Sequence, residues 1–367
     1  GQPVGPPHLA LRGRLDDAHC GGVCVVANGW AGPLGEALPT RRGRRTGIEA
    51  DNRPMMAAGD LRGHGRCRTV IVSCGEALVD LVPDAVPGGG PMNVAIAAAR
   101  LGAPSAFVGR VSTDRYGEMI WDHLQANDVD LRACERGSEP TARAIVEHKP
   151  QLVFRFEGDN TADMNLEAAD LSQLDSGPHI VHGGTLGLFR GGTADTLAAL
   201  VEVHRGIISL DPNVRPQIID DRSRWEHYHQ RWVDNAHIYK SSDEDFAWIW
   251  PNRALASCAE QLLEGAARVV FATHGGDGVT VYWRGGELKV PGRSVDVVDT
   301  VGAGDTFAAT VLVALWERGL AGAGHMLGEL DLADWRSIAE RAVAAAAITC
   351  SRAGADPPRA SELSLPE

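Results

Sequence analysis

The sequence predicts an α/β fold with a mostly parallel central sheet, and three observations support that prediction. From residue 69 onward, short apolar runs alternate with helical stretches, which is the order that builds parallel strands joined by helical crossovers. Several of the runs are rich in Val, Ile and Leu, as in strands buried on both faces. Hydrophobic residues make up 44% of the chain but aromatic residues only 5%, so an aliphatic core is expected.

Apolar runs and the residues typical of helix starts and ends locate the first predicted elements. Thr69–Gly75 is mostly apolar and predicts the first strand. Pro91–Leu101 predicts a helix, because proline stands at its start and Gly102 follows its end. Ser105–Val111 then predicts a strand and Asp114–Ala126 a helix.

The same alternation continues towards the C-terminal part. Val295–Val298 is strand-like and precedes the helical run Thr306–Leu315. Further strands are expected at 179–182, 206–210, 237–240 and 269–273, and helices at 193–204 and 255–266. This order favours right-handed crossovers and therefore a parallel sheet flanked by helices.

One segment breaks the alternation. Thr141–His148 and Leu152–Glu157 are two strand-like runs joined by Lys149–Gln151, which predicts a β-hairpin over residues 141–157. Such a hairpin is either an edge decoration of the α/β body or a lid that closes over a substrate and excludes water.

Charge and cysteine content exclude some classes of protein. The formal net charge of −13 argues against a nucleic-acid or acidic-membrane partner, since both require a basic surface. No run of 18 apolar residues is present, so no membrane-spanning helix is expected. The seven cysteines are mostly scattered, which fits a reduced, cytoplasmic setting.

The first 68 residues differ in composition from the remainder. They are rich in Gly, Pro and Arg, lack sustained periodicity and carry a basic run at 41–45. A basic run could bind an anionic partner, but we favour a disordered or non-native extension.

The strongest chemical pattern is Asp299–Asp305, a small-residue turn that leads into a helix. Helix N-termini bind anions because their N–H groups lack intrahelical partners and the helix dipole is positive there. Gly302 and Gly304 would let the backbone approach a phosphate closely, and Asp305 could reach an attacking group. On its own, Asp305 is equally compatible with a simple helix cap. A Walker A loop is excluded, since Gly-Lys-Ser/Thr occurs nowhere.

A second pattern opens the first predicted helix. Gly88–Asn93 contains three consecutive glycines, then proline, methionine and asparagine. Three glycines alone often mark only a flexible turn.

Together these segments resemble the ribokinase-like carbohydrate kinases, also called the PfkB family. The resemblance covers about residues 69–360, and it includes Gly88–Gly102, Phe107–Gly117 and Asp299–Asp305. It implies a ribokinase-like kinase domain over 69–360, with the 141–157 hairpin as a small β lid and 361–367 as a C-terminal tail. It also implies ATP-dependent phosphorylation of a sugar hydroxyl.

The resemblance assigns roles to particular residues. Asp305 matches the family's catalytic base, and the N–H groups of Gly302, Ala303 and Gly304 match its anion hole. The residues that match sugar contacts are Asp80, Gly88, Gly89, Asn93 and Asp305. The residues that match nucleotide contacts are Lys240, Ser242, Thr273, Gly275, Gly276, Gly278, Gly302 and Gly304.

Metal sites are implied in the same way. Asp245 matches a residue that acts on Mg²⁺ through water, although this chain has Ser242 and Asp245 where the family pattern has Asn and Glu. That departure leaves open which carboxylate of the 243–245 cluster acts on the metal. Asp299 and Gly354 match a monovalent-cation site, which implies a possible K⁺ requirement.

Three segments are similar to the fructokinase branch of the family and narrow the choice of sugar substrate. Gly88–Asn93, Leu210–Pro216 and Cys350–Pro357 are similar to that branch, which implies fructose as acceptor and fructose 6-phosphate as product. Ribose, 2-keto-3-deoxygluconate or a nucleoside remain alternatives, as does a catalytically silent sugar-binding protein on the same fold. The family also implies that a homodimer could form through the lid.

Overall fold

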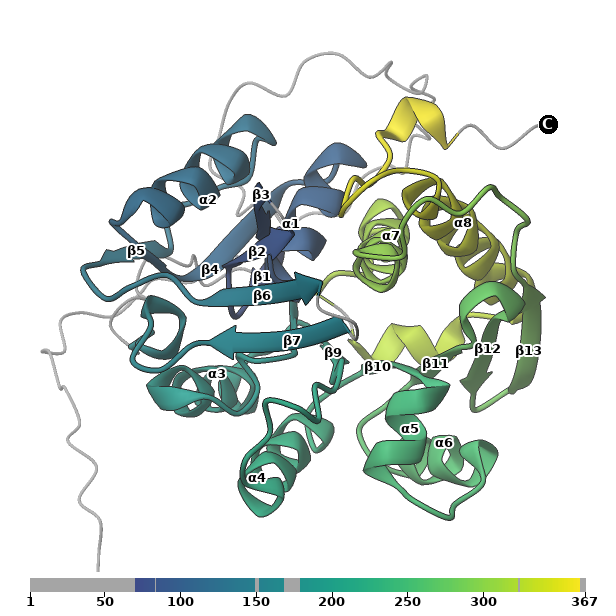
Figure 1. The fold of residues 1–367 in the computed structure, drawn as a ribbon. Helices are drawn as coiled ribbons and strands as arrows, with labels where there is room; N and C mark the ends of the chain where they lie inside the picture. Colours follow the sequence, from purple (N-terminus) through teal and green to yellow (C-terminus); the bar gives the residue numbers. More distant parts are fainter. Residues whose placement is uncertain (1–69, 83, 149–151, 168–178, 323, 364–367) are drawn as a thin grey trace, which may run out of the picture. The chain divides into compact units, whose positions relative to one another are not determined.

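The computed structural model describes residues 70–82, 84–148, 152–167, 179–322 and 324–363 (Figure 1). These residues all belong to one unit that spans 64–367. The predicted extension over 1–68 lies outside the described residues, as do the tip of the predicted hairpin at 149–151 and most of the predicted tail.

A nine-stranded sheet forms the centre of the described unit, in the order β13-β12-β11-β10-β9-β8-β1-β4-β5. All neighbours from β11 to β5 are parallel, and only β12 and β13 run antiparallel. The strands are β1 Ile71–Cys74, β4 Ser105–Ser112, β5 Cys134–Gly137, β8 Ile180–Gly184, β9 Ile207–Asp211, β10 Ile238–Ser242, β11 Val269–Thr273, β12 Gly278–Trp283 and β13 Gly286–Pro291.

Strand order reverses at β1. From β1 the chain proceeds to β4 and β5 on one side, whereas β8 to β13 follow on the other side. Loops that leave two neighbouring parallel strands in opposite directions open a crevice at the carboxyl ends of those strands. The fold therefore places a crevice beside the ends of β1 and β8.

Helices cover both faces of this sheet (Figure 1). One face packs against α1 Gly90–Arg100, α7 Ala303–Glu317 and α8 Leu332–Cys350. The other packs against α3 Gly191–Val203, α4 Arg222–Val233, α5 Asp243–Ile249 and α6 Leu255–Glu264. The helix α2 Arg115–Ala126 packs beside α1 and β4.

Strand register explains why the sheet is buried on both faces. Ile71, Ile180 and Ile207 are paired across β1, β8 and β9 and lie in the core on the α7 side. The next residue of each strand points the other way, because side chains alternate across a strand, and Val72 and Val181 lie in the core on the α3 side. The runs predicted as strands at 69–75, 179–182 and 206–210 are thus confirmed as buried strands.

Helix α7 is buried on every side. All residues from Thr306 to Leu315 are buried, as expected for a helix that is apolar all round and lies in a core. Its N-cap, Gly302, has φ 75°, a backbone conformation that glycine adopts without strain. The helix therefore starts at a fixed point inside the unit.

A second, four-stranded sheet has the order β3-β2-β6-β7. Its strands are β2 Leu78–Val82, β3 Asp84–Gly88, β6 Arg143–His148 and β7 Leu152–Glu157. The predicted hairpin is confirmed as β6 and β7, which pair antiparallel. The sequence analysis does not predict β2 or β3, which pair antiparallel and form a second hairpin.

One predicted strand is wrong. Val295–Val298 has no strand conformation, and the strand in this part of the chain is β13. The N–H groups of Val298 and Asp299 donate to the Cys350 carbonyl at the end of α8 rather than to a sheet neighbour. Helices α4, α5 and α8 and strands β2, β3, β5, β12 and β13 are additional to those predicted, whereas the other predicted strands and helices are present.

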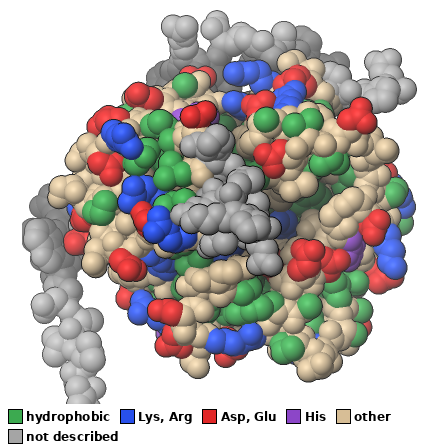
Figure 2. Space-filling model, viewed as in Figure 1, with side chains coloured by type: hydrophobic (Ala, Val, Ile, Leu, Met, Phe, Trp, Pro, Cys, Tyr) green, Lys and Arg blue, Asp and Glu red, His purple; other side chains and the backbone are tan. Residues whose placement is uncertain are grey.

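The visible surface is mixed in charge. On the uncovered part of the face shown in Figure 2, Lys and Arg side chains are scattered among Asp and Glu side chains. Within the described ranges, none of the helices combines the length and apolar character that a bilayer crossing requires.

Replacement of Leu312 by alanine tests the buried position of α7. Leu312 has 0% exposure, so Leu312→Ala should lower the free energy of unfolding by about 2–5 kcal/mol in urea denaturation. Val203→Ala, at a position with 67% exposure, is the matched control and should change it by about 0.5 kcal/mol or less. Equal losses in the two variants would contradict the assignment of α7 to the core.

Candidate active site

Polar side chains converge where the parallel strands end and α7 begins. Asp211 is the last residue of β9 and Lys240 lies in β10. Thr185 directly follows β8, and Asp305 lies in the first turn of α7. This is the crevice that the strand order creates.

Asp305 and Asn93 are brought together from positions 212 residues apart. The Asn93 Nδ2 donates to Asp305 Oδ2 at 2.8 Å. A Cβ atom on Gly90 would lie 2.7 Å from Thr185 Oγ1 and 3.5 Å from Asp305 Oδ1. The start of α1 thus forms one wall of the crevice, and glycine at position 90 leaves space among these polar groups.

The predicted sugar-side residues Asp80 and Gly88 also meet. The β2–β3 pairing places Asp80 so close to Gly88 that a Cβ on Gly88 would lie 2.5 Å from Asp80 Oδ2. Burial raises the pKa of Asp80 to about 6, although Arg215 lowers it. Gly89 has φ 120° and precedes α1. Gly88 and Gly89 connect β3 to α1. Asp80, which lies beside Gly88, is therefore on the same wall of the crevice as Asn93.

Lys240 forms a buried ion pair with Asp211. Its Nζ donates to Asp211 Oδ2 at 2.6 Å, and the two side chains are 9% and 5% exposed. Burial alone lowers the pKa of Lys240, but the Asp211 carboxylate outweighs that effect and the pKa is raised. A Cβ on Gly304 would lie 2.9 Å from Lys240 Nζ. A charged ammonium group therefore lies directly against the first turn of α7.

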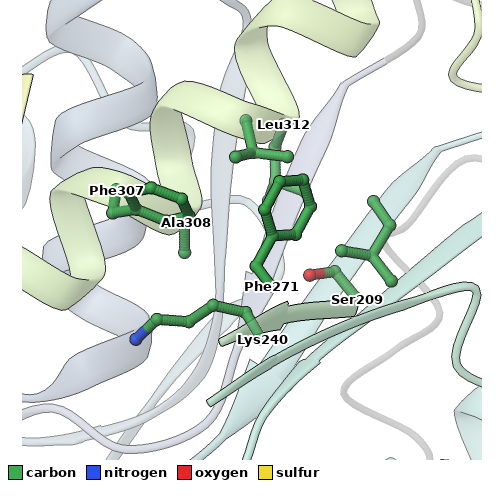
Figure 3. Close-up of a pocket in the computed structure, with 8 residues that line it drawn as sticks. Ser209, Lys240, Phe271, Phe307, Ala308 and Leu312 are labelled. Carbon is green, nitrogen blue, oxygen red and sulfur yellow. The ribbon is translucent and has the colours of Figure 1, made fainter. Parts of the chain in front are cut away.

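The stem of Lys240 is part of the hydrophobic core. Figure 3 shows it beside Phe271 and Phe307, with its amine pointing away from both rings. The cavity that these side chains line leaves no room for a water molecule. The cavity is therefore a packing defect behind the crevice, and the surrounding side chains restrict where the amine can lie.

Asp305 is electrostatically poised between opposing groups. Burial raises its pKa to about 6, the hydrogen bond from Asn93 lowers it, and Asp211 raises it further. Lys240 and Arg215 lower it. The Asp305 carboxyl group can consequently exchange a proton close to neutral pH.

The residues predicted to form an anion hole lie at the start of α7. Gly302 caps α7, and N–H groups in a first helical turn lack intrahelical partners. The Ala303 N–H, however, donates to the Thr300 carbonyl at 3.3 Å. Ala303 is therefore engaged in the turn, which leaves Gly302 and Gly304 as the better candidates for an anion.

Asp245 occupies the first turn of α5. Ser242 caps this helix and accepts from the Asp245 N–H at 3.1 Å, while Asp245 Oδ1 accepts from the Val214 N–H at 3.2 Å. Burial raises the pKa of Asp245 to about 6, with a further contribution from Asp211. Asp245 thus lies within electrostatic reach of the buried ion pair.

Asp299 and Gly354 are also adjacent. Asp299 Oδ2 accepts from the Gly354 N–H at 2.9 Å, and its Oδ1 accepts from the Val301 N–H at 3.1 Å. A Cβ on Gly302 would lie 2.6 Å from the Cβ of Ala355, so this loop packs closely on the start of α7. Among the described residues, no group of three or more His, Cys, Asp or Glu side chains has the geometry of a metal site.

The predicted nucleotide-side glycines lie in the turn between β11 and β12. Thr273 ends β11, and a 3₁₀ turn over Gly275–Asp277 leads to Gly278 at the start of β12. No atom lies within 4 Å of a Cβ built on Gly275 or Gly276, so space is open beside them. His274, which the sequence analysis does not single out, joins this turn to α5 through Asp243, 3.1 Å away.

Comparisons with known proteins agree with this geometry. The sequence model described as pfkB family carbohydrate kinase matches residues 83–362. The chain belongs to this family. The predicted family and fold are confirmed, and the protein is a ribokinase-like carbohydrate kinase.

Several of the similar proteins are named fructokinases. The fructokinase of Rhizobium leguminosarum bv. trifolii is 34% identical over 259 residues, which is 67% of this chain and 79% of the relative. The structure of fructokinase with bound ATP from Xylella fastidiosa has a TM-score of 0.69 and 26% identity, and the match covers 80% of this chain and 96% of that one. Fructokinase from Vibrio cholerae O395, with fructose, ADP and a calcium ion, has a TM-score of 0.68 and 26% identity, over 78% and 94%. A double mutant of the same enzyme contains fructose, ADP and a potassium ion, with a TM-score of 0.69 and 25% identity over 80% and 95%.

Replacement of Asp211 tests the buried ion pair. Asp211→Asn leaves the Lys240 ammonium buried without its counter-charge, so the free energy of unfolding should fall by about 3–5 kcal/mol in urea denaturation. Glu226→Gln is the matched control, because Glu226 pairs with Arg222 on the surface with side chains 41% (Arg222) and 54% (Glu226) exposed. That variant should lose about 1 kcal/mol at most. A loss of that size in Asp211→Asn would show that the pair is not buried.

Proposed function

We propose that this carbohydrate kinase transfers the γ-phosphate of ATP to the 6-hydroxyl of fructose. The observation that carries the proposal is the Asn93–Asp305 hydrogen bond at the start of α7, with the Lys240 ammonium beside Gly304. A base, an anion site and a cation thus lie around one point. Fructose is favoured because relatives that are 32–34% identical to this chain are named fructokinases.

Asp305 accepts the proton of the attacking hydroxyl. The residue is half-buried, and its pKa of about 6 keeps it mostly ionised at neutral pH. Asn93 holds one carboxylate oxygen, which leaves the other oxygen, near Gly90 and Thr185, for the sugar hydroxyl. Proton removal in the transition state raises the nucleophilicity of the hydroxyl.

Charge on the transferred phosphoryl group is stabilised by fixed groups. The N–H groups of Gly302 and Gly304 lie at the positive end of the α7 dipole, where they can bind an anion. The Lys240 ammonium contributes a full charge from a position restricted by Asp211 and the core. Because these groups are already in place, little reorganisation is required during transfer.

Mg²⁺ fits the part of the crevice that contains Asp211 and Asp245. Asp211 Oδ1 is buried and has no hydrogen-bond partner among the described residues, and Asp245 lies nearby. Carboxylate oxygens suit Mg²⁺, which commonly uses one or two of them together with water and substrate phosphates. We therefore assign the metal to Asp245, with Asp211 beside it. When bound, Mg²⁺ neutralises phosphate charge.

A K⁺ ion beside Asp299 and Gly354 completes the cofactor proposal. The contact of this loop with Gly302 links it to the start of α7, and the Vibrio cholerae double mutant contains a potassium ion. Residues 275–278 are proposed to contact the nucleoside part of ATP, since the turn is open.

The β3-β2-β6-β7 sheet is proposed to close as a lid, because both ends of its β6–β7 hairpin are fixed to the body. Thr141, just before β6, donates its N–H and hydroxyl to Asp114 at 2.9 and 2.7 Å. After β7, the Gly158 carbonyl accepts from Arg190, which pairs with buried Asp163 at 3.1 Å. A hairpin that is held at both ends can move as a unit, close over the sugar and exclude water.

A cytoplasmic location and a homodimer through the lid complete the proposal. Cys74 and Cys134 are buried free thiols, which suits a reducing compartment. Val86 on the lid edge strand β3 is 44% exposed and is available for pairing with a second copy.

ADP release tests the sugar assignment. The protein with ATP and Mg²⁺ should release ADP fastest with fructose, and more slowly with ribose, 2-keto-3-deoxygluconate or a nucleoside. Assays with and without K⁺ test the cation proposal. Sugar binding without any ADP release would instead indicate a silent sugar-binding protein.

Asp305→Asn removes the base while it preserves size and the possibility of a hydrogen bond with Asn93. The value of kcat should fall by about 10²–10⁴-fold, the contribution of general-base catalysis, with an unchanged thermal unfolding midpoint. A variant that retains near-native kcat would show that Asp305 only caps α7.

The pH profile follows from the Asp305 pKa of about 6. Only the ionised carboxylate accepts a proton, so kcat/KM for fructose should rise about tenfold per pH unit below pH 6 and level off above about pH 7. The measurement is initial velocity between pH 4.5 and 8 at constant ionic strength. A flat profile across pH 6 would exclude Asp305 as the titrating base.

A further inference from the structure

Glu76 is a buried acid in the crevice to which the proposed mechanism gives no role. It follows β1 and has 0% exposure. Its Oε1 accepts from the Gly90 N–H at 3.2 Å, and its Oε2 accepts from the Gly187 N–H at 2.9 Å. Both carboxylate oxygens are therefore bound to main chain from two separate segments.

Those two segments form opposite parts of the proposed sugar pocket. Gly90 is the first residue of α1, the helix that carries Asn93. Gly187 lies in the loop after β8, close to Thr185, whose hydroxyl accepts from Asn213 at 3.2 Å. The space beside Gly90 is bordered by Thr185 and Asp305. Glu76 thus connects the two segments that border this space through its hydrogen bonds to Gly90 and Gly187.

Close backbone contacts surround this link. A Cβ on Gly187 would lie 2.8 Å from Gly75 Cα, and a Cβ on Gly89 would lie 2.7 Å from the Glu76 carbonyl oxygen. Gly75 and Glu76, which follow β1, therefore have no room to shift without moving α1 or the loop after β8. The side chain of Glu76 is the polar connection between them.

Burial of an acid at this position costs free energy. Burial raises the pKa of Glu76 to about 8, the Gly187 N–H lowers it, and Asp163 and Asp305 raise it. An apolar side chain would avoid that cost. The carboxyl group compensates for part of it by accepting two main-chain hydrogen bonds.

We propose that Glu76 is a positioning residue that holds the start of α1 and the loop after β8 at the separation that the sugar requires, and so sets sugar affinity. The proposal rests on the proposed function, in which this crevice binds fructose. Glu76 touches neither the reacting hydroxyl nor ATP, and it acts through Gly90 and Gly187.

Two variants of Glu76 test the proposal. Glu76→Gln turns an NH₂ group towards one of the two N–H donors, and Glu76→Asp is shorter by about 1.5 Å, so neither can satisfy both. In each variant KM for fructose should rise about tenfold or more, whereas KM for ATP stays within about twofold, as expected when a buried main-chain N–H loses its hydrogen-bond acceptor. Fructose binding by calorimetry without ATP should weaken by the same factor.

Hydrogen exchange provides a readout without catalysis. The amides of Gly90 and Gly187 should exchange about tenfold faster in both variants than in the wild type. Glu226→Gln, which removes an exposed carboxylate of α4, is the control and should leave both amides and both KM values unchanged.

Distinct outcomes overturn the proposal and the proposed function. Unchanged fructose KM in folded Glu76 variants, or equal increases of both KM values with a lower unfolding midpoint, would overturn the positioning role. If the wild type phosphorylates no sugar, the proposed function fails. In that case, unchanged hydrogen exchange at the Gly90 and Gly187 amides in the Glu76 variants would also reject the positioning role of Glu76.

Discussion

The candidate active site depends on one buried interaction, the ion pair between Lys240 and Asp211. An ammonium group in a protein interior is tolerated only with a counter-charge in good geometry. The aliphatic stem of Lys240 fills the core beside Phe271 and Phe307 (Figure 3). The positive charge is thereby fixed against the first turn of α7, where phosphate charge is expected to develop.

Topology supplies the remaining groups. The strand order reverses at β1, so the segments after β1, β8 and β9 meet in one crevice although they are far apart in sequence. The fully buried helix α7 then directs its positive end into that crevice. Asp305 lies in its first turn, and the hydrogen bond from Asn93 connects it with α1. The sugar wall and the phosphate site are therefore held by the same core.

The sequence predicts the parts of the site that depend on local patterns. Gly302, Gly304, Asp305 and Asn93 are recognisable because each lies at a helix start, next to glycines or proline. Glu76 and Asp211 are not recognisable in that way, since their roles come from which strands are neighbours. The error at Val295–Val298 has a similar cause, because an apolar run does not reveal that the Val298 N–H donates to the Cys350 carbonyl instead of to a strand.

A crystal structure with fructose and a non-hydrolysable ATP analogue tests the central claim most directly. The account predicts the 6-hydroxyl of fructose at about 2.6–3.2 Å from an Asp305 oxygen. It also predicts the γ-phosphate between that hydroxyl and the N–H groups of Gly302 and Gly304, with Lys240 still paired to Asp211. A complex in which the sugar lies away from Asp305, and Asp305 contacts only Asn93, would contradict the account.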